Sequence, residues 1–234
     1  MLYIIGLGLN VDGISKFGLE VLKRCKRVYL ENYTVDFPYS VGNLEEVLGK
    51  KIVPVKREFV EGFEVVDEAR KLDVALLVYG SPLTATTHIS LIQEAKKCNV
   101  RCKVIYNASV LDAVADTGLQ IYKFGKIASM PEFEADSFME IVKDNQKINA
   151  HSLILIDIGL DFHEALEKLE KASKEHKIKL GKIVACSMLG TRKKRIYYQN
   201  IKGLDELEVQ APYCFIIPSK LHFVEKEVLE EFAK

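Results

Sequence analysis

The sequence predicts a protein of two α/β domains, the first built on a parallel, Rossmann-like sheet and the second on a mixed sheet. Short apolar runs alternate with amphipathic stretches, which is typical of β–α–β units. Residues 74–79 form an unbroken apolar run, as in a strand buried on both faces. Residues 183–188 and 195–200 are strand-like segments joined only by a short loop, which favours a hairpin and therefore antiparallel pairing.

The first half of the chain is predicted to alternate strands with helices. Ser15 is a suitable N-cap, and the first helix ends among Lys23, Arg24 and Lys26, where the helix dipole favours cations. Gly49 closes the second helix. The predicted strands are residues 2–9, 28–31, 51–55, 74–79 and 103–106, and the predicted helices follow Ser15 and span 41–48, 61–72, 84–97 and 109–117.

After Gly125 the pattern restarts, with strands that no longer alternate regularly with helices. The predicted strands are residues 126–130, 153–157, 183–188, 195–200 and 213–217, and the predicted helices are 135–144, 163–174 and 224–232. We place the boundary within residues 107–124 and divide the chain into domains 1–110 and 111–234.

The composition excludes several classes of protein. The chain has 234 residues and is 48% hydrophobic, which is enough for substantial cores. Basic and acidic residues number 33 each, so no net positive charge attracts nucleic acid. No apolar run approaches the roughly 20 residues of a membrane helix, and no basic leader precedes the first strand, so we expect a cytoplasmic protein without a membrane partner. Five widely spaced cysteines favour free thiols over disulfides or a metal site.

Two loops are candidates for ligand binding because they follow predicted parallel strands, and ligands bind beyond the carboxyl ends of such strands. They are residues 6–10 (GLGLN) and 80–88 (GSPLTATTH), whose glycines allow a ligand to approach the backbone. Each also has a structural interpretation, as a common strand–helix turn or an N-cap. A dinucleotide fingerprint fails at Val11, since the next glycine is Gly13, so a dehydrogenase remains only a weak alternative.

Other polar residues favour structural roles. We expect His88 to be packed and hydrogen-bonded, His163 and His176 to face solvent, and Asp157 and Asp161 to cap loops. The sequence holds none of the motifs of hydrolases or kinases.

Several segments, in order along the chain, resemble the archaeal diphthine synthases of the tetrapyrrole methylase superfamily. The segments are residues 3–9 (YIIGLGL), 30–34 (LENYT), 80–88, 107–110 (NASV), 118–125 (GLQIYKFG) and 217–225 (IPSKLHFVE). The resemblance implies a homodimeric enzyme that holds S-adenosylmethionine in a cleft between its two domains. It implies cofactor contacts from Leu9, Ser81, Thr84, Ser109, Val110, Ile156, Leu189 and His222, with no catalytic residue assigned and no metal.

The implied reaction is trimethylation of the amine of a 3-amino-3-carboxypropyl group on a modified histidine of translation elongation factor 2, giving diphthine. Ser81 replaces the acid usual in this family, so the cofactor's sulfonium loses a negative neighbour. Ser219 replaces a glycine, and Leu189-Gly190-Thr191 stands for the family's Ala-Gly-Ser. The alternatives are a methyltransferase for tetrapyrroles and a cofactor-binding module with reduced or lost activity.

Two further hypotheses concern the surroundings of the site. Tyr79, Tyr106 and Tyr122 are candidates for cation–π contact with the quaternary ammonium product, although core packing is the favoured interpretation for each. The basic residues 192–195 either attract an acidic surface of the elongation factor or form an ordinary exposed hairpin turn, which we favour slightly.

Overall fold

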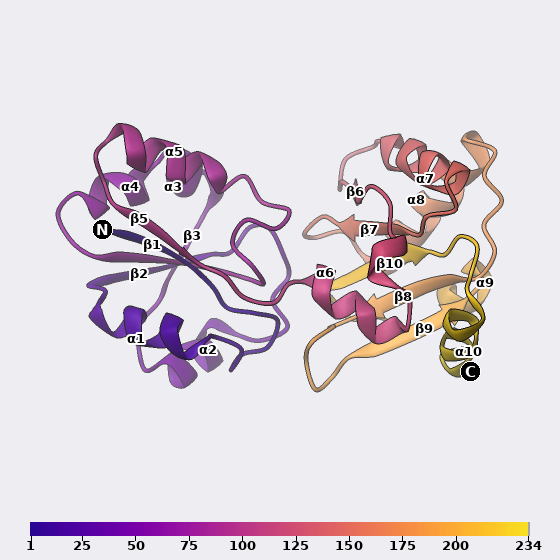
Figure 1. Ribbon diagram of the computed structural model, residues 1–234, viewed down its shortest axis with the longest axis horizontal. Coiled ribbons are helices and arrows are strands. Elements are labelled where there is room, and N and C mark those ends of the chain that lie inside the picture. Colours follow the sequence, from indigo (N-terminus) through magenta and orange to yellow (C-terminus); the bar gives the residue numbers. More distant parts are fainter. Residues whose placement is uncertain (234) are drawn as a thin grey trace. The chain divides into compact units, whose positions relative to one another are not determined.

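The computed structural model describes residues 1–233 of the chain. The chain divides into two compact units, Met1–Asp112 (unit 1) and Ala113–Lys234 (unit 2). Each unit contains one five-stranded sheet with its own hydrophobic core (Figure 1).

Unit 1 is built on a parallel sheet, as the sequence predicts. The strand order is β3-β2-β4-β1-β5, and every pair of neighbouring strands is parallel. The central strand β4 is buried at every position, which explains its unbroken apolar sequence. The strands are β1 (Leu2–Gly6), β2 (Arg27–Glu31), β3 (Val53–Val55), β4 (Val74–Val78) and β5 (Cys102–Ile105).

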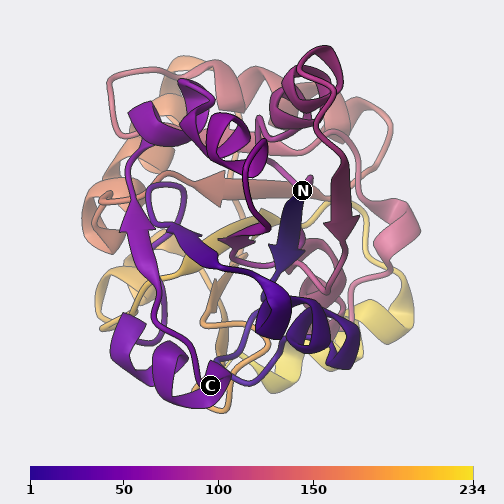
Figure 2. The same ribbon diagram turned by 90° about the vertical axis from the view of Figure 1, so that its left-hand side faces the viewer.

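Helices cover both faces of this sheet (Figure 2). On one face α1 (Lys16–Arg24) and α2 (Val41–Leu48) pack against the sheet. On the other face lie α3 (Arg57–Glu61), α4 (Glu64–Ala69) and α5 (Ile89–Lys97). The predicted caps are confirmed, because Ser15 accepts a hydrogen bond from the backbone of Gly18 and Gly49 adopts the left-handed conformation.

Two predicted helices of unit 1 are wrong in extent. The helix expected over residues 61–72 is shortened to α4, because Gly62 ends the preceding helix α3 and Phe63 adopts a left-handed conformation with φ of 67°. The helix expected over 84–97 begins only at Ile89. Residues 81–88 instead form a turn, in which Ala85 has a φ of 55° that a helix does not allow.

Unit 2 contains the predicted mixed sheet, in the order β6-β7-β10-β8-β9. β6 and β7 are parallel, whereas the other pairs are antiparallel, including the predicted hairpin of β8 and β9. The strands are β6 (Ala128–Met130), β7 (Ser152–Ile156), β8 (Ile183–Ser187), β9 (Arg195–Gln199) and β10 (Tyr213–Ile217).

One face of the unit 2 sheet packs against α7 (Ser137–Lys147) and α8 (Phe162–Glu175), which contribute Phe138 and Phe162 to the core. The unit also contains α10 (Phe223–Glu231) and α9 (Ile201–Asp205), a helix that the sequence analysis missed. The helix expected over 109–117 is α6 (Val110–Ala113) followed by a 3-10 turn, η1 (Val114–Thr117). A second 3-10 turn, η2 (Ile121–Lys123), was also missed.

Three absences hold for residues 1–233. None of their helices is long and apolar enough to cross a membrane. They contain no cluster of side chains suited to a metal ion. All five cysteines are free, and Cys25, Cys186 and Cys214 are buried, in agreement with the expectation of unpaired thiols.

Candidate functional site

The first part of the site is a cluster of turns at the carboxyl ends of β1, β4 and β5, which are neighbours in the unit 1 sheet. Gly8 and Gly80 pair through two backbone hydrogen bonds of 3.1 and 2.9 Å. Both adopt left-handed conformations, with φ of 70° and 69°. A Cβ added to Gly6 would lie 2.6 Å from the carbonyl oxygen of Gly80. Glycine is therefore required where the first and fourth strands end.

The Asn107 side chain joins the turn after β5 to this pair. Its Nδ2 donates to the carbonyl oxygens of Gly6 at 3.0 Å and Gly13 at 2.9 Å. Its Oδ1 accepts from the backbone of Ala108 at 2.8 Å. The Asn107 amide thus ties the ends of β1 and β5 together.

Three segments that carry predicted cofactor residues lie side by side in this cluster. An ideal Cβ on Gly80 would be 3.7 Å from the Cα of Ser109 and 3.9 Å from the Cδ2 of Leu9. Leu9 and Ser109 are both buried. The Tyr79 hydroxyl donates to the carbonyl oxygen of Leu9 at 3.2 Å. Leu9 and Ser109 therefore lie beside the backbone of Gly80.

The turn after Gly80 holds Ser81 and Thr84. The Thr84 backbone donates to the carbonyl of Ser81 at 3.1 Å, and Ser81 itself is buried. The carbonyl of Pro82 accepts from the Thr86 hydroxyl at 2.6 Å and from Nδ1 of His88 at 3.1 Å. Burial lowers the pKa of His88, against the effect of this hydrogen bond. The packed, hydrogen-bonded His88 that the sequence predicts is confirmed.

Ser109 directly precedes α6, which begins at Val110. The Ser109 backbone donates to Oδ2 of Asp112 at 2.7 Å, and its hydroxyl donates to the same oxygen at 3.1 Å. The same hydroxyl accepts from the backbone of Leu111 at 3.2 Å. This capping arrangement fixes Ser109, and Val110 follows it half-buried.

Glu31 ends β2 and is fully buried, at 0% exposure. The Thr34 hydroxyl donates to its Oε2 at 3.0 Å, whereas its Oε1 has no hydrogen-bond partner among the residues that the structure describes. Burial raises the pKa of Glu31 to about 7, although Thr34 and the Arg57 charge oppose the shift. Glu31 stands at the end of the second strand, roughly where a dinucleotide-binding fold has its ribose-binding acid, but a carboxyl group so enclosed is not presented to a ribose.

The remaining three predicted cofactor residues lie in unit 2 and do not form one turn. Ile156 ends β7, and Leu189 follows the end of β8. The register pairs Tyr213 with Ser187 and Ile217 with Ser152, so these two residues lie at the end of the sheet where β10 begins. His222 follows the opposite end of β10. The full length of the strands separates the two groups along the sheet.

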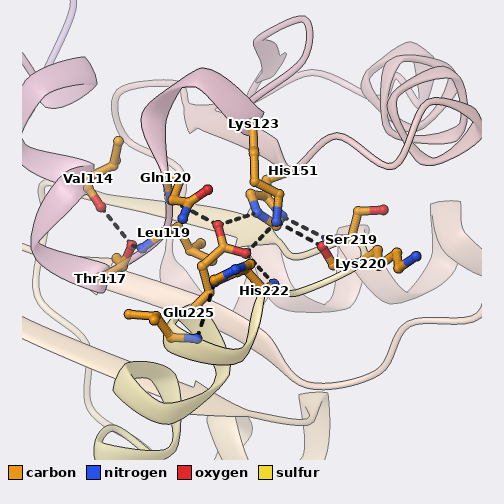
Figure 3. A network of polar contacts seen from close by, with 11 residues as sticks. Val114, Thr117, Leu119, Gln120, Lys123, His151, Ser219, Lys220, His222 and Glu225 are labelled. Atoms are coloured by element: carbon orange, nitrogen blue, oxygen red, sulfur yellow. Dashed lines mark hydrogen bonds and ion pairs between the residues drawn. The ribbon is translucent and has the colours of Figure 1, made fainter.

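The turn that carries His222 is held by a buried polar network (Figure 3). The hub is Glu225 at 0% exposure, which accepts from the backbone of Gln120 at 3.0 Å and of His222 at 2.7 Å. It also accepts from Nε2 of His151 at 3.2 Å and forms an ion pair with Lys123. Burial alone would raise the pKa of Glu225, but these donors outweigh it and lower the pKa to about 2.

The tyrosines proposed for product binding differ from one another. Tyr79 packs with Phe37 and Tyr39, at ring-centroid distances of 5.2 and 6.4 Å. Tyr106 is 64% exposed and Tyr122 is 84% exposed. The favoured interpretation of core packing is therefore wrong for Tyr106 and Tyr122.

The remaining polar predictions concern surface groups. Asp161 caps α8, and Asp157 accepts from the backbone of Ile158, so capping is confirmed for both. His163 pairs with Asp205, and His176 pairs with Asp136 at 2.8 Å, so both are held by acids and only partly exposed. Residues 192–195 are exposed: the first three lie in the loop between β8 and β9, where Lys194 pairs with Asp116, and Arg195 begins β9.

Sequence reasoning missed the residues that fix these turns. An asparagine directly after a predicted strand was the available signal for Asn107. A glutamate three residues after His222 was the signal for Glu225, since that spacing is typical of a capping box.

Comparison with known proteins defines the class. Residues 1–205 match the model of the family described as Tetrapyrrole (Corrin/Porphyrin) Methylases. Because this match covers most of the chain, the chain belongs to the tetrapyrrole methylase family.

Relatives that match over nearly the full length are named diphthine synthase or diphthine methyl ester synthase. "Diphthine synthase" from Methanocaldococcus jannaschii is 36% identical, with 98% of each chain covered. "Probable diphthine methyl ester synthase" from Arabidopsis thaliana is 36% identical, with 98% of this chain and 97% of that protein covered. A crystal structure of diphthine synthase has a TM-score of 0.91 at 32% identity, with 99% of this chain and 95% of that chain covered. The predicted resemblance to the diphthine synthases is confirmed, as are the predicted fold and the prediction of a methyltransferase.

Proposed function

We propose that the protein transfers three methyl groups from S-adenosylmethionine to the amine of a 3-amino-3-carboxypropyl group on a modified histidine of translation elongation factor 2, giving diphthine. The observation that carries this proposal is the similarity to diphthine synthases over nearly the whole of both chains. Such an enzyme acts in the cytoplasm, where translation takes place.

The turns of unit 1 fit a nucleoside cofactor. The backbone of Gly80 carries no side chain and packs beside Leu9 and Ser109, and the proposal places the nucleoside against these turns. Ser81 and Thr84 contribute hydroxyls from the adjoining turn. Ser81 brings no negative charge, so we expect weaker attraction of the cofactor's sulfonium than in relatives with an acid there.

The proposed methyl transfer does not require covalent catalysis by the protein. S-adenosylmethionine, when bound, supplies a methyl group already activated by its positively charged sulfur. The chain contributes fixed turns that align the reactants and exclude water, which is a large part of catalysis for such a transfer. The substrate amine has to lose a proton before it attacks, and bulk water is able to accept that proton.

The direct test is mass spectrometry of elongation factor 2 carrying the 3-amino-3-carboxypropyl histidine, after incubation with this protein and S-adenosylmethionine. We expect a mass increase of three methyl groups on that histidine. No increase on the factor, together with methylation of a precorrin substrate, would instead support the tetrapyrrole alternative.

A methyl ester is the second candidate product, because the Arabidopsis relative is named for it and matches this chain over the same extent. An ester adds one further methyl group, on the carboxylate, and mild alkaline hydrolysis removes it. A fourth methyl group that alkali removes would therefore identify an ester-forming enzyme.

Calorimetry with S-adenosylmethionine measures whether the chain binds the proposed cofactor. Binding without methyl transfer would support the alternative of a cofactor-binding module that has lost activity. Ser81→Asp restores an acid beside Gly80, so we expect tighter binding than by the natural chain. Sedimentation of the same samples tests the proposed homodimer. A chain that binds neither the methyl donor nor its demethylated product would contradict the proposed function.

A further inference from the structure

The network around Glu225 has no role in the transfer just described, yet it holds the main chain of the turn between β10 and α10. The backbone of Ser219 donates to Nδ1 of His151 at 3.0 Å. The carbonyl of Lys220 accepts from Nζ of Lys123 at 2.9 Å. The backbone of His222 donates to Oε2 of Glu225 at 2.7 Å. Three of the four residues 219–222 therefore rest on network side chains.

The three supporting side chains depend on one another. Glu225 pairs with the Lys123 ammonium and accepts from Nε2 of His151, and both Glu225 and His151 are fully buried. Removal of the donors leaves the buried carboxylate unpaired, and removal of the carboxylate leaves the donors unpaired. In either case an unpaired buried group costs a large free energy of desolvation. Loss of the Glu225 charge would therefore disturb all of the contacts to the turn together.

The hydrogen bonds also fix the protonation state of His151. Nδ1 accepts the N–H of Ser219, so it carries no proton, and the ring's single proton lies on Nε2, facing Glu225. A second proton, on Nδ1, would place two hydrogen-bond donors opposite each other, the ring N–H and the backbone N–H of Ser219. The groups that act on the ring are the charge of Lys123 at the end of η2, Phe124 directly after it, Glu225 from α10, and the backbone of Ser219.

We propose that Glu225 and His151 are positioning residues that fix the turn of residues 219–222, and with it His222, for binding of the methyl donor, and that protonation of His151 releases this turn. The inference rests on the proposed function, because the resemblance alone assigns His222 to the cofactor. Burial lowers the pKa of His151, although Glu225 opposes that shift, so the ring stays neutral and the turn stays ordered at neutral pH.

Calorimetric titration with S-adenosylmethionine between mildly acidic and neutral pH tests the inference. His151→Asn places an acceptor near the position of Nδ1 but does not titrate, whereas His151→Gln places its amide near Nε2 and removes that acceptor. We expect Glu225→Gln and His151→Gln to weaken binding at least about tenfold, the size expected when a buried orienting hydrogen bond is lost. We expect the natural chain to bind S-adenosylmethionine less tightly at acidic than at neutral pH. His151→Asn should bind nearly as tightly as the natural chain at neutral pH and should show no further weakening at acidic pH.

Two controls separate positioning from general loss of stability. Glu230→Gln removes an exposed charge of the same helix, paired with Lys182, and should leave binding unchanged. Leu169→Ala removes packing from the unit 2 core without touching the turn. If Leu169→Ala weakened binding as much as Glu225→Gln at equal loss of stability, the positioning role would be wrong.

Hydrogen exchange of the ligand-free protein gives a readout that does not depend on the cofactor. The amides of Ser219 and His222 should lose protection in His151→Gln and Glu225→Gln while the amides of β10 keep theirs. If the natural chain binds no methyl donor, the proposed function is wrong. If it binds the methyl donor and both variants bind it equally tightly, only this inference is wrong.

Discussion

Two buried glutamates, one in each unit, have opposite pKa shifts. Glu31 and Glu225 are both 0% exposed. Burial raises the pKa of Glu31 to about 7, while the pKa of Glu225 falls to about 2. Glu31 accepts one hydrogen bond from Thr34, whereas Glu225 accepts from two backbone amides, His151 and Lys123. Burial raises the pKa of both carboxyl groups, and the larger number and the charge of the donors around Glu225 reverse the shift there.

The largest expected difference is in the response to removal of the charge. Glu225→Gln should lower the free energy of unfolding by about 3–5 kcal/mol, because it leaves Lys123 without its anion and breaks a buried hydrogen-bond network. Glu31→Gln, the same change at equal burial, should cost less than about 1 kcal/mol at neutral pH. Urea denaturation of both variants measures the two values, and equal costs would refute the comparison.

Acid should destabilise unit 2 through Glu225. Its folded pKa of about 2 lies below the ordinary value of 4.5, so the unfolded chain takes up the proton first as the pH falls. The stabilisation is therefore complete above about pH 5 and is lost as the pH falls towards 2, by about 2 kcal/mol or more. Denaturation curves recorded across this range should be flatter for Glu225→Gln. An identical slope in both proteins would show that Glu225 is not the titrating group.

Glu31 should act in the opposite direction. Its folded pKa of about 7 lies above the ordinary value of 4.5, so the folded chain retains a proton that the unfolded chain has released. Its contribution is present below about pH 4.5 and is lost as the pH rises through 7. The stability of Glu31→Gln relative to the natural chain should therefore rise by about 3 kcal/mol between about pH 4.5 and pH 7. The crossing of the two stability–pH curves is the measurement, and parallel curves would contradict it.

The smallest expected effect concerns a buried hydroxyl group of unit 1. The Tyr39 hydroxyl is buried without a hydrogen-bond partner among the described residues, so Tyr39→Phe should change stability by no more than about 0.5 kcal/mol. Tyr29 is the matched control, because its hydroxyl donates to Glu68 at 2.7 Å, and Tyr29→Phe should cost about 1 kcal/mol. Thermal melts of the two variants distinguish these values, and equal losses would show that Tyr39 has a partner in solution.

The elements that the sequence predicts well are those set by local patterns. The apolar run of β4 and the glycines after β1 and β4 place both the parallel sheet and its candidate ligand turns. The helix expected over 84–97 starts five residues late, at Ile89, because the side chains of Thr86 and His88 both bind the carbonyl of Pro82. Apolar periodicity does not reveal this preference for a turn.

The unit 2 network is of the kind that periodicity does not predict. Glu225 is separated from Lys123 by 102 residues and from His151 by 74. No local pattern specifies such a meeting, and only the capping spacing from His222 to Glu225 is visible in the sequence. The family resemblance includes the 217–225 segment but gives no physical reason for the residues in it.

The Asn107 amide makes the two turns after β1 and β5 mechanically dependent on each other. Its two N–H groups hold Gly6 and Gly13 while its oxygen holds Ala108, so none of these loops can shift alone without breaking a hydrogen bond. Slow deamidation would replace the donor with a negatively charged oxygen facing two carbonyls. Deamidation at this one asparagine during storage would then loosen both turns together. Mildly acidic pH slows that reaction but also favours protonation of His151.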